Sequence, residues 1–259
     1  MKLIDSHIHF YSEEYAEDRT TLMEEAVQEG IQQFYLPSID SSYYNSMREC
    51  EEKFGTESMQ LMMGLHPVYV KPDTYEAELE FVAEQLQKRQ FAAVGEIGID
   101  LYWDVTTLEI QKHAFKEQIT LAKQCDLPIV IHSRNSYNEV MEVLQDAGRG
   151  TISGIFHCFT GSEEEALRVI DMGMKIGIGG VLTFKNGGIN QWIKNIDLEH
   201  IVLETDGPYL APAPYRGKRN VPAYLKIVAQ TLADIHERPL VEVAAITSEN
   251  CLKVFKTYD

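Results

Sequence analysis

The sequence has little positive charge. Its 23 Lys and Arg residues are outnumbered by 40 Asp and Glu residues, which leaves a net charge of −17. A protein that grips nucleic acid over a broad surface normally carries a basic patch or stripe. This balance excludes such a footprint overall. Any recognition of phosphate must therefore be local, or must be carried by a metal ion.

The sequence also lacks signals for disulfides, membranes and multiple domains. Its four cysteines are scattered and none forms a C-x-x-C pair, which suits free thiols in a reducing cytosol. No run approaches the roughly 18 apolar residues of a membrane span. Asp5 interrupts the apolar N-terminal stretch, so we expect no signal peptide. Because no linker or repeat is visible, we expect one cytoplasmic domain over residues 1–259, without a membrane partner. No pattern indicates an oligomeric state.

Short apolar runs typical of β-strands recur along the chain. Segments with helical periodicity lie between them, for example at 74–90 and 107–125. Strands that alternate with helices favour a parallel sheet covered by helices. Eight such units in this length fit a closed (β/α)₈ TIM barrel, and a doubly wound open sheet is the alternative. The eight runs are 3–10, 32–39, 60–67, 92–100, 128–134, 153–159, 174–184 and 200–208.

Polar residues interrupt these runs near their carboxyl ends. A buried parallel strand should be almost continuously apolar. In a TIM barrel the carboxyl ends of the strands carry the active site, so polar residues there on several strands predict one shared site. These residues are His7, His9, His66, Glu96, His132, Arg134, His157, Glu204 and Asp206.

The stretch "LIDSHIHF" places two imidazoles two residues apart. Side chains alternate across a strand, so His7 and His9 should point the same way and could grip one cation. With them we group two further histidines and two carboxylates. Six ligands exceed the needs of one tetrahedral ion and suit two ions bridged by Glu96. Imidazole-rich ligation suits Zn or Mn better than Mg. The predicted ligands are His7, His9, Glu96, His132, His157 and Asp206.

Seven motifs in order resemble the TatD-related metal-dependent hydrolases of the amidohydrolase superfamily. They are "DSHIHF", "GLHP", "VGEIGID", "IHSR", "FHCFTGS", "LETDGPYLAP" and "YRGKRN". The resemblance covers nearly the whole chain. It implies a TIM barrel, a divalent metal site and deoxyribonuclease activity of the TatD type, with the same six residues as ligands. The fourth run offers Glu96 and no lysine, which points away from relatives whose metals are bridged by a carboxylated lysine.

The predicted mechanism uses two carboxylates directly. Glu96 bridges the ions, which form the usual clamp for hydrolysing phosphate esters. Asp206 accepts the proton of the attacking water. One ion is expected at His7, His9, Glu96 and Asp206, and the other at Glu96, His132 and His157. Glu204 and Asp5 are expected to orient ligand imidazoles, and Asp100 is a further candidate for that role.

Substrate contacts require cations near the metals. The segment "YRGKRN" supplies Arg216, Lys218 and Arg219 just after the eighth run, and arginine can fork onto phosphate oxygens. Arg134 and His66 are further candidates. Tyr102, Trp103 and Tyr209 could stack a base or pack in the core. We therefore predict a deoxyribonuclease that acts exonucleolytically on DNA ends or single strands. The alternative is an amide or ester hydrolase, such as an aminoacyl-tRNA deacylase.

Overall fold

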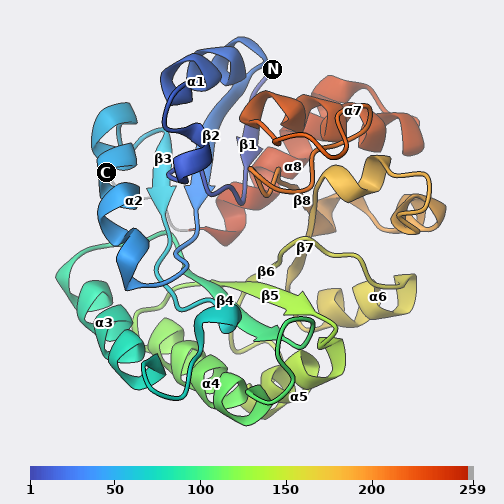
Figure 1. Cartoon of the computed structure of the whole chain (residues 1–259). Helices are drawn as coiled ribbons and strands as arrows, with labels where there is room; N and C mark the ends of the chain where they lie inside the picture. Colours follow the sequence, from blue (N-terminus) through green and yellow to red (C-terminus); the bar gives the residue numbers. More distant parts are fainter. Residues whose placement is uncertain (256–259) are drawn as a thin grey trace.

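The computed structural model describes residues 1–255, in which parallel strands alternate with helices around a central axis (Figure 1). Each predicted run overlaps one strand, and β2 and β3 begin one residue before their runs. The strands are β1 Leu3–Asp5, β2 Ile31–Leu36, β3 Met59–Leu61, β4 Val94–Asp100, β5 Ile129–Arg134, β6 Gly154–Phe156, β7 Lys175–Ile178 and β8 Ile201–Leu203. The α-helices are α1 Arg19–Gln28, α2 Tyr44–Phe54, α3 Tyr75–Lys88, α4 Leu108–Gln124, α5 Tyr137–Ala147, α6 Glu163–Asp171, α7 Leu225–Ile235 and α8 Leu240–Val254.

Hydrogen bonds close the strands into a barrel. Hydrogen-bonded ladders join β1 to β3 in order and β4 to β8 in order, and every pairing is parallel. Between the two groups, Met63 beyond β3 forms a parallel bridge with Val94 of β4. On the other side, the Ser6 N–H beyond β1 donates to the Leu203 C=O of β8 at 3.0 Å. The predicted TIM barrel is confirmed, and the open sheet is excluded.

An apolar layer inside the barrel fixes the height of the polar residues. Val130, Ile155 and Val202 belong to one buried cluster with Ile4 and Tyr35, separate from the larger core between strands and helices. Val130 lies between two isoleucines of that larger core, so it points inward. The next inward positions, two residues further along each strand, are His132, His157 and Glu204.

The seventh βα unit departs from the predicted alternation. The expected run 174–184 is a strand only as far as Ile178, and Gly180–Thr183 forms a 3₁₀ turn. A Cβ atom at Gly180 would lie 2.1 Å from the Leu210 carbonyl oxygen, so this close approach of two loops requires glycine. Three more 3₁₀ turns lead to β8: Ile189–Gln191, Ile193–Asn195 and Leu198–His200.

Two α-helices, α7 and α8, follow β8. Pro239 directly precedes α8. Asn250 of α8 donates to the carbonyls of Leu198 at 2.7 Å and Ile201 at 2.8 Å, which ties this helix to the start of β8. No described helix has the length and apolar character required to cross a membrane.

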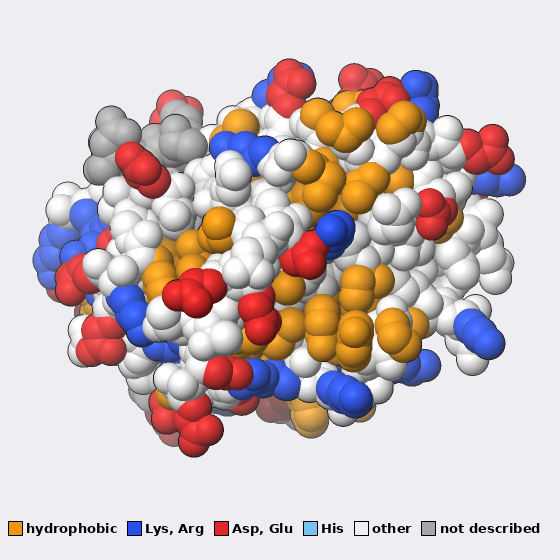
Figure 2. Space-filling view, turned by 90° about the horizontal axis from the view of Figure 1, so that it is seen from above, with side chains coloured by type: hydrophobic (Ala, Val, Ile, Leu, Met, Phe, Trp, Pro, Cys, Tyr) orange, Lys and Arg blue, Asp and Glu red, His pale blue; other side chains and the backbone are white. Residues whose placement is uncertain are grey.

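The charges visible on the face at the top of Figure 1 are mixed. Figure 2 shows hydrophobic side chains gathered in the middle of this face, with Lys and Arg interspersed among Asp and Glu. Interspersed charges give no extended positive field. This face therefore offers no broad basic surface to a polyanion.

Candidate metal centre

Glu96 lies at the centre of a group of imidazoles. It sits on β4, and its side chain is 2% exposed. Each neighbouring ring has one nitrogen within 4 Å of a carboxylate oxygen of Glu96. The distances are 2.7 Å for His132 Nδ1, 3.1 Å for His7 Nε2, 3.3 Å for His66 Nε2, 3.5 Å for His157 Nε2 and 3.7 Å for His9 Nε2. The structure thus brings histidines from four βα units to one buried carboxylate on a fifth.

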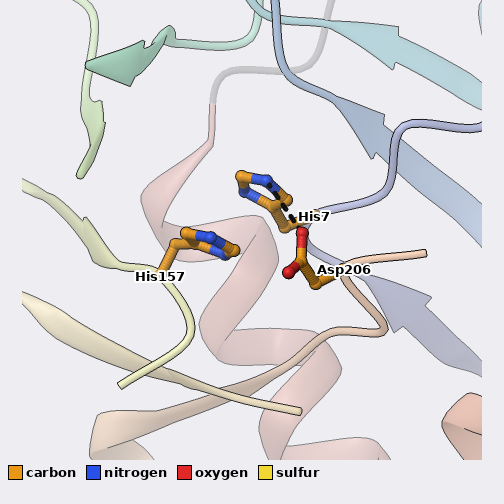
Figure 3. A group of neighbouring side chains, drawn as sticks. All are labelled: His7, His157 and Asp206. Atoms are coloured by element: carbon orange, nitrogen blue, oxygen red, sulfur yellow. Dashed lines mark ion pairs between the residues drawn. The ribbon is translucent and has the colours of Figure 1, made fainter. Parts of the chain in front are cut away.

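His7, His157 and Asp206 lie together, as Figure 3 shows. The rings of His7 and His157 stack with their centroids 3.6 Å apart. Asp206 Oδ1 lies 3.8 Å from His7 Nε2 and 3.7 Å from His9 Nε2. The ligand atoms of His7, His9 and Glu96 are also mutually close, as are those of His66, Glu96 and His132.

The backbone holds Asp206 and His7 together. The Asp206 N–H donates to the His7 C=O at 2.9 Å, across the seam between β8 and β1. Asp206 has a φ of 55°, in the left-handed region that few non-glycine residues adopt. Residues held in such conformations cluster at functional sites.

The buried polar atoms of the centre fit a divalent cation. His7 is fully buried; its Nδ1 makes no hydrogen bond to any described residue, and its Nε2 lies 3.1 Å from Glu96 Oε2 without the geometry of a hydrogen bond. Buried nitrogens normally find a partner. A neutral imidazole offers one lone pair, and imidazole with carboxylate is a donor set that suits Zn or Mn. The residues present therefore fit the predicted metal ions.

The pKa values of the buried groups also fit a bound cation. Burial raises the pKa of Asp206 to about 7 and lowers the pKa of His9 to about 4, because a dry site disfavours either charge. Burial would also lower the pKa of His157, but the charges of Glu204 and Glu96 raise it to about 10. A cation would compete with that proton, since ligand imidazoles must be neutral.

Glu204, which the sequence predicts to orient an imidazole, contacts the ring of His157. Glu204 is fully buried, and its Oε1 lies 3.0 Å from His157 Nδ1 and accepts the Cys158 N–H at 2.6 Å. Gly177 of β7 leaves room for this carboxylate, because a Cβ there would lie 2.3 Å from Glu204 Oε2. Glu204 therefore fixes both the ring and the backbone of the segment that carries His157.

We expect Glu204→Gln to weaken metal binding by about 10- to 100-fold, since partners of ligand imidazoles contribute that much. Competition with a chelating dye would measure the affinity. Glu164→Gln, on an exposed position of α6, is the matched control and should leave the affinity unchanged. Equal affinities in the two variants, both with native melting temperatures, would remove the orienting role of Glu204.

Asp5 differs from the sequence-based expectation. Its carboxylate contacts no imidazole ring among the described residues. Its Oδ1 accepts the backbone N–H groups of His7 at 3.2 Å and Thr205 at 3.0 Å, and its Oδ2 accepts the Thr205 hydroxyl at 2.6 Å. Asp5 therefore supports the backbone of two site segments. Strand alternation does not extend from Asp5 to His7 and His9, because β1 ends at Asp5.

Asp100 and His66 have a larger part in the centre than the sequence suggested. Asp100 Oδ2 lies 2.8 Å from His132 Nε2, on the side of the ring opposite Glu96. His66 Nδ1 accepts the Val68 N–H at 3.1 Å, so its proton sits on Nε2, which faces Glu96. Glu96 and Asp100 are four residues apart on β4. Because side chains alternate along a strand, this even separation predicts that both carboxylates lie on one face.

The predicted phosphate contacts divide into two groups. Arg134, Arg216 and Lys218 are exposed and form no ion pair with another described residue. Arg219 instead donates hydrogen bonds to the Asp18 carboxylate at 3.1 Å and to the Glu14 carbonyl. The expectation that Arg219 is available to phosphate therefore differs from the structure, because Asp18, the residue just before α1, pairs with it.

A (β/α)₈ barrel with imidazoles gathered around a carboxylate at the carboxyl end of its strands has the architecture of metal-dependent hydrolases. The sequence pattern of the family described as TatD related DNase matches residues 4–256. The chain belongs to this family, so the predicted resemblance is confirmed.

Similar proteins agree with this assignment. YabD of Bacillus subtilis, named an uncharacterized metal-dependent hydrolase, is 36% identical over 255 residues, which cover 98% of this chain and 99% of that protein. The crystal structure of YjjV, a TatD homologue from Escherichia coli, superimposes with a TM-score of 0.91 at 28% identity, over 98% of this chain and 97% of that one. A TatD family hydrolase from Entamoeba histolytica shares the fold, with a TM-score of 0.86 at 21% identity over 100% and 99% of the two chains. The chain is thus a metal-dependent hydrolase of the TatD family.

Proposed function

We propose that this protein is a divalent-metal-dependent phosphodiesterase, a deoxyribonuclease that acts on DNA ends or single strands. The observation that carries the proposal is the buried Glu96 carboxylate, which faces five imidazoles and lies beside Asp206. Paired divalent ions are the usual clamp for phosphate ester hydrolysis. The family description names DNase activity, which supports the same reaction.

Six residues would hold two divalent ions, of Zn, Mn or Mg. His7, His9, Glu96 and Asp206 would hold the first, and Glu96, His132 and His157 the second. When bound, such ions act as Lewis acids toward phosphoryl oxygens. Glu96 can serve both because each of its oxygens faces a different set of rings: Oε2 faces His7 and His9, and Oε1 faces His132 and His157.

The proton and the phosphate are handled by the chain itself. Asp206 takes the proton of the attacking water, because its carboxylate lies within 4 Å of the His7 and His9 rings at the centre. Arg134, Arg216 and Lys218 present exposed charges that can contact phosphate. They are few, and the net charge is −17, so counterion release from long duplexes contributes little affinity. We therefore infer that the enzyme engages a strand end locally, which favours exonucleolytic action.

The proposal is tested with one labelled single strand, supplied linear and circularised, and with a mischarged tRNA. Metal-loaded enzyme should degrade the linear strand at least about tenfold faster than the circle, because the circle has no end to engage locally. A chelator should abolish the reaction. Equal cleavage of the circle would reject the exonuclease assignment. Deacylation of the tRNA with both strands intact would replace the phosphodiesterase by an ester hydrolase.

A further inference from the structure

The loop between β4 and α4 exposes two aromatic side chains at the carboxyl end of the barrel. Trp103 is 67% exposed and Tyr102 is 54% exposed. Large aromatic side chains are usually buried to a high degree. Core packing does not account for either ring at these exposures. The two residues are available to a ligand that has a flat face.

The guanidinium of Arg134 lies against these rings. It ends β5 directly opposite Asp100 of β4, and its guanidinium lies 3.7 Å from the centre of the Tyr102 ring and 5.7 Å from that of Trp103. The two aromatic rings are perpendicular, with centroids 5.0 Å apart. We call Tyr102, Trp103 and Arg134 the aromatic platform. It combines a ring face for stacking with a cation for phosphate.

Asp100 connects the aromatic platform to the metal centre. Its Oδ1 accepts the backbone N–H groups of Tyr102 at 2.9 Å and Trp103 at 3.2 Å, while its Oδ2 lies 2.8 Å from His132 Nε2. Gln111 of α4 holds the backbone of Asp100, accepting its N–H at 2.7 Å and donating to its C=O at 3.1 Å. One carboxylate thus sets the position of the loop relative to a proposed metal ligand.

We propose that the aromatic platform stacks the unpaired nucleobase adjacent to the phosphate that is cleaved. This rests on the proposed function and specifies its substrate: a nucleic acid whose end is single-stranded. Bases in a duplex show only their edges, whereas an unpaired base offers its face to Trp103 or Tyr102. Arg134 meets the phosphate next to that base, which compensates locally for the acidic chain.

The test compares two short single strands that are identical except for an abasic terminal nucleotide. Trp103→Ala should raise KM about tenfold for the base-bearing strand, with kcat changed less than twofold, because stacking contributes binding of that order. The abasic strand should be insensitive to the substitution. Trp103→Phe, which keeps a ring, should restore KM. Val105→Ala, 66% exposed on the same loop, is the matched control and should leave both constants unchanged.

A binding measurement separates this proposal from the nuclease assignment. The chain has tryptophan only at positions 103 and 192, so tetrathymidylate added to metal-free protein should quench fluorescence in the wild type and not in Trp103→Phe. Base-dependent quenching without cleavage of any strand would keep the platform and reject the phosphodiesterase. Cleavage of both strands with the same KM in Trp103→Ala as in the wild type would keep the phosphodiesterase and overturn the platform.

Discussion

Glu96→Gln should lower turnover by on the order of 10³-fold, because the metal-mediated stabilisation of transition-state charge is worth several kcal/mol. Five imidazole nitrogens lie within 3.7 Å of this carboxylate. A neutral amide of the same size offers one oxygen acceptor in place of two charged oxygens. It could not bridge two ions. Metal content by plasma mass spectrometry, measured beside kcat, should fall to one ion or none.

The control for this variant separates chemistry from folding. Glu164→Gln on the exposed face of α6 makes the same chemical change away from the centre and should keep full turnover and metal content. Glu96→Gln should retain the circular dichroism of the native barrel, because the apolar layer beneath the site is untouched. A Glu96→Gln protein with two bound ions and native turnover would eliminate Glu96 as the bridge.

Asp206→Asn should reduce kcat by about 10²- to 10⁴-fold, the range that a positioned general base contributes. Asn cannot accept the proton of the attacking water at neutral pH. The substitution preserves size, and the Asp206 N–H can still donate to the His7 carbonyl. Single-turnover rates with saturating metal would measure the chemical step separately from metal affinity.

Metal content decides how that loss is interpreted. If both ions remain bound and the rate falls, Asp206 acts on the proton. If one ion is lost with the rate, Asp206 acts as a ligand. Asp73→Asn, in an exposed loop before α3, is the matched control and should behave as the wild type. Full turnover of Asp206→Asn with both ions bound would refute the general-base role.

The positions of strands and of several site residues could be predicted because they follow from local rules. His132 and His157 lie two residues beyond inward valine and isoleucine side chains, and strand alternation carries each imidazole to the same height. The same rule placed Glu204 on the inner face, where it contacts the His157 ring. Polar residues at the ends of apolar runs were therefore enough to locate the centre at one end of the barrel.

The contacts that the sequence could not predict depend on partners far away in the chain. Arg219 bonds to Asp18, 201 residues away, and Asp5 bonds to Thr205, 200 residues away. No local pattern reveals such neighbours. The apolar run 174–184 predicts a strand along its whole length. In the structure the chain turns at Gly180, which packs closely against the carbonyl of Leu210. That approach belongs to tertiary structure, so the 3₁₀ turn after β7 could not be read from hydropathy.

The seam between β8 and β1 has a consequence for how the enzyme becomes active. Two of the proposed ligands lie within the first ten residues, and a third, Asp206, joins them only when its amide reaches His7. Contacts of such long sequence separation form late and at a high entropic cost. During synthesis, the ribosome must therefore release about four-fifths of the polypeptide before a metal ion can be captured with its full set of donors.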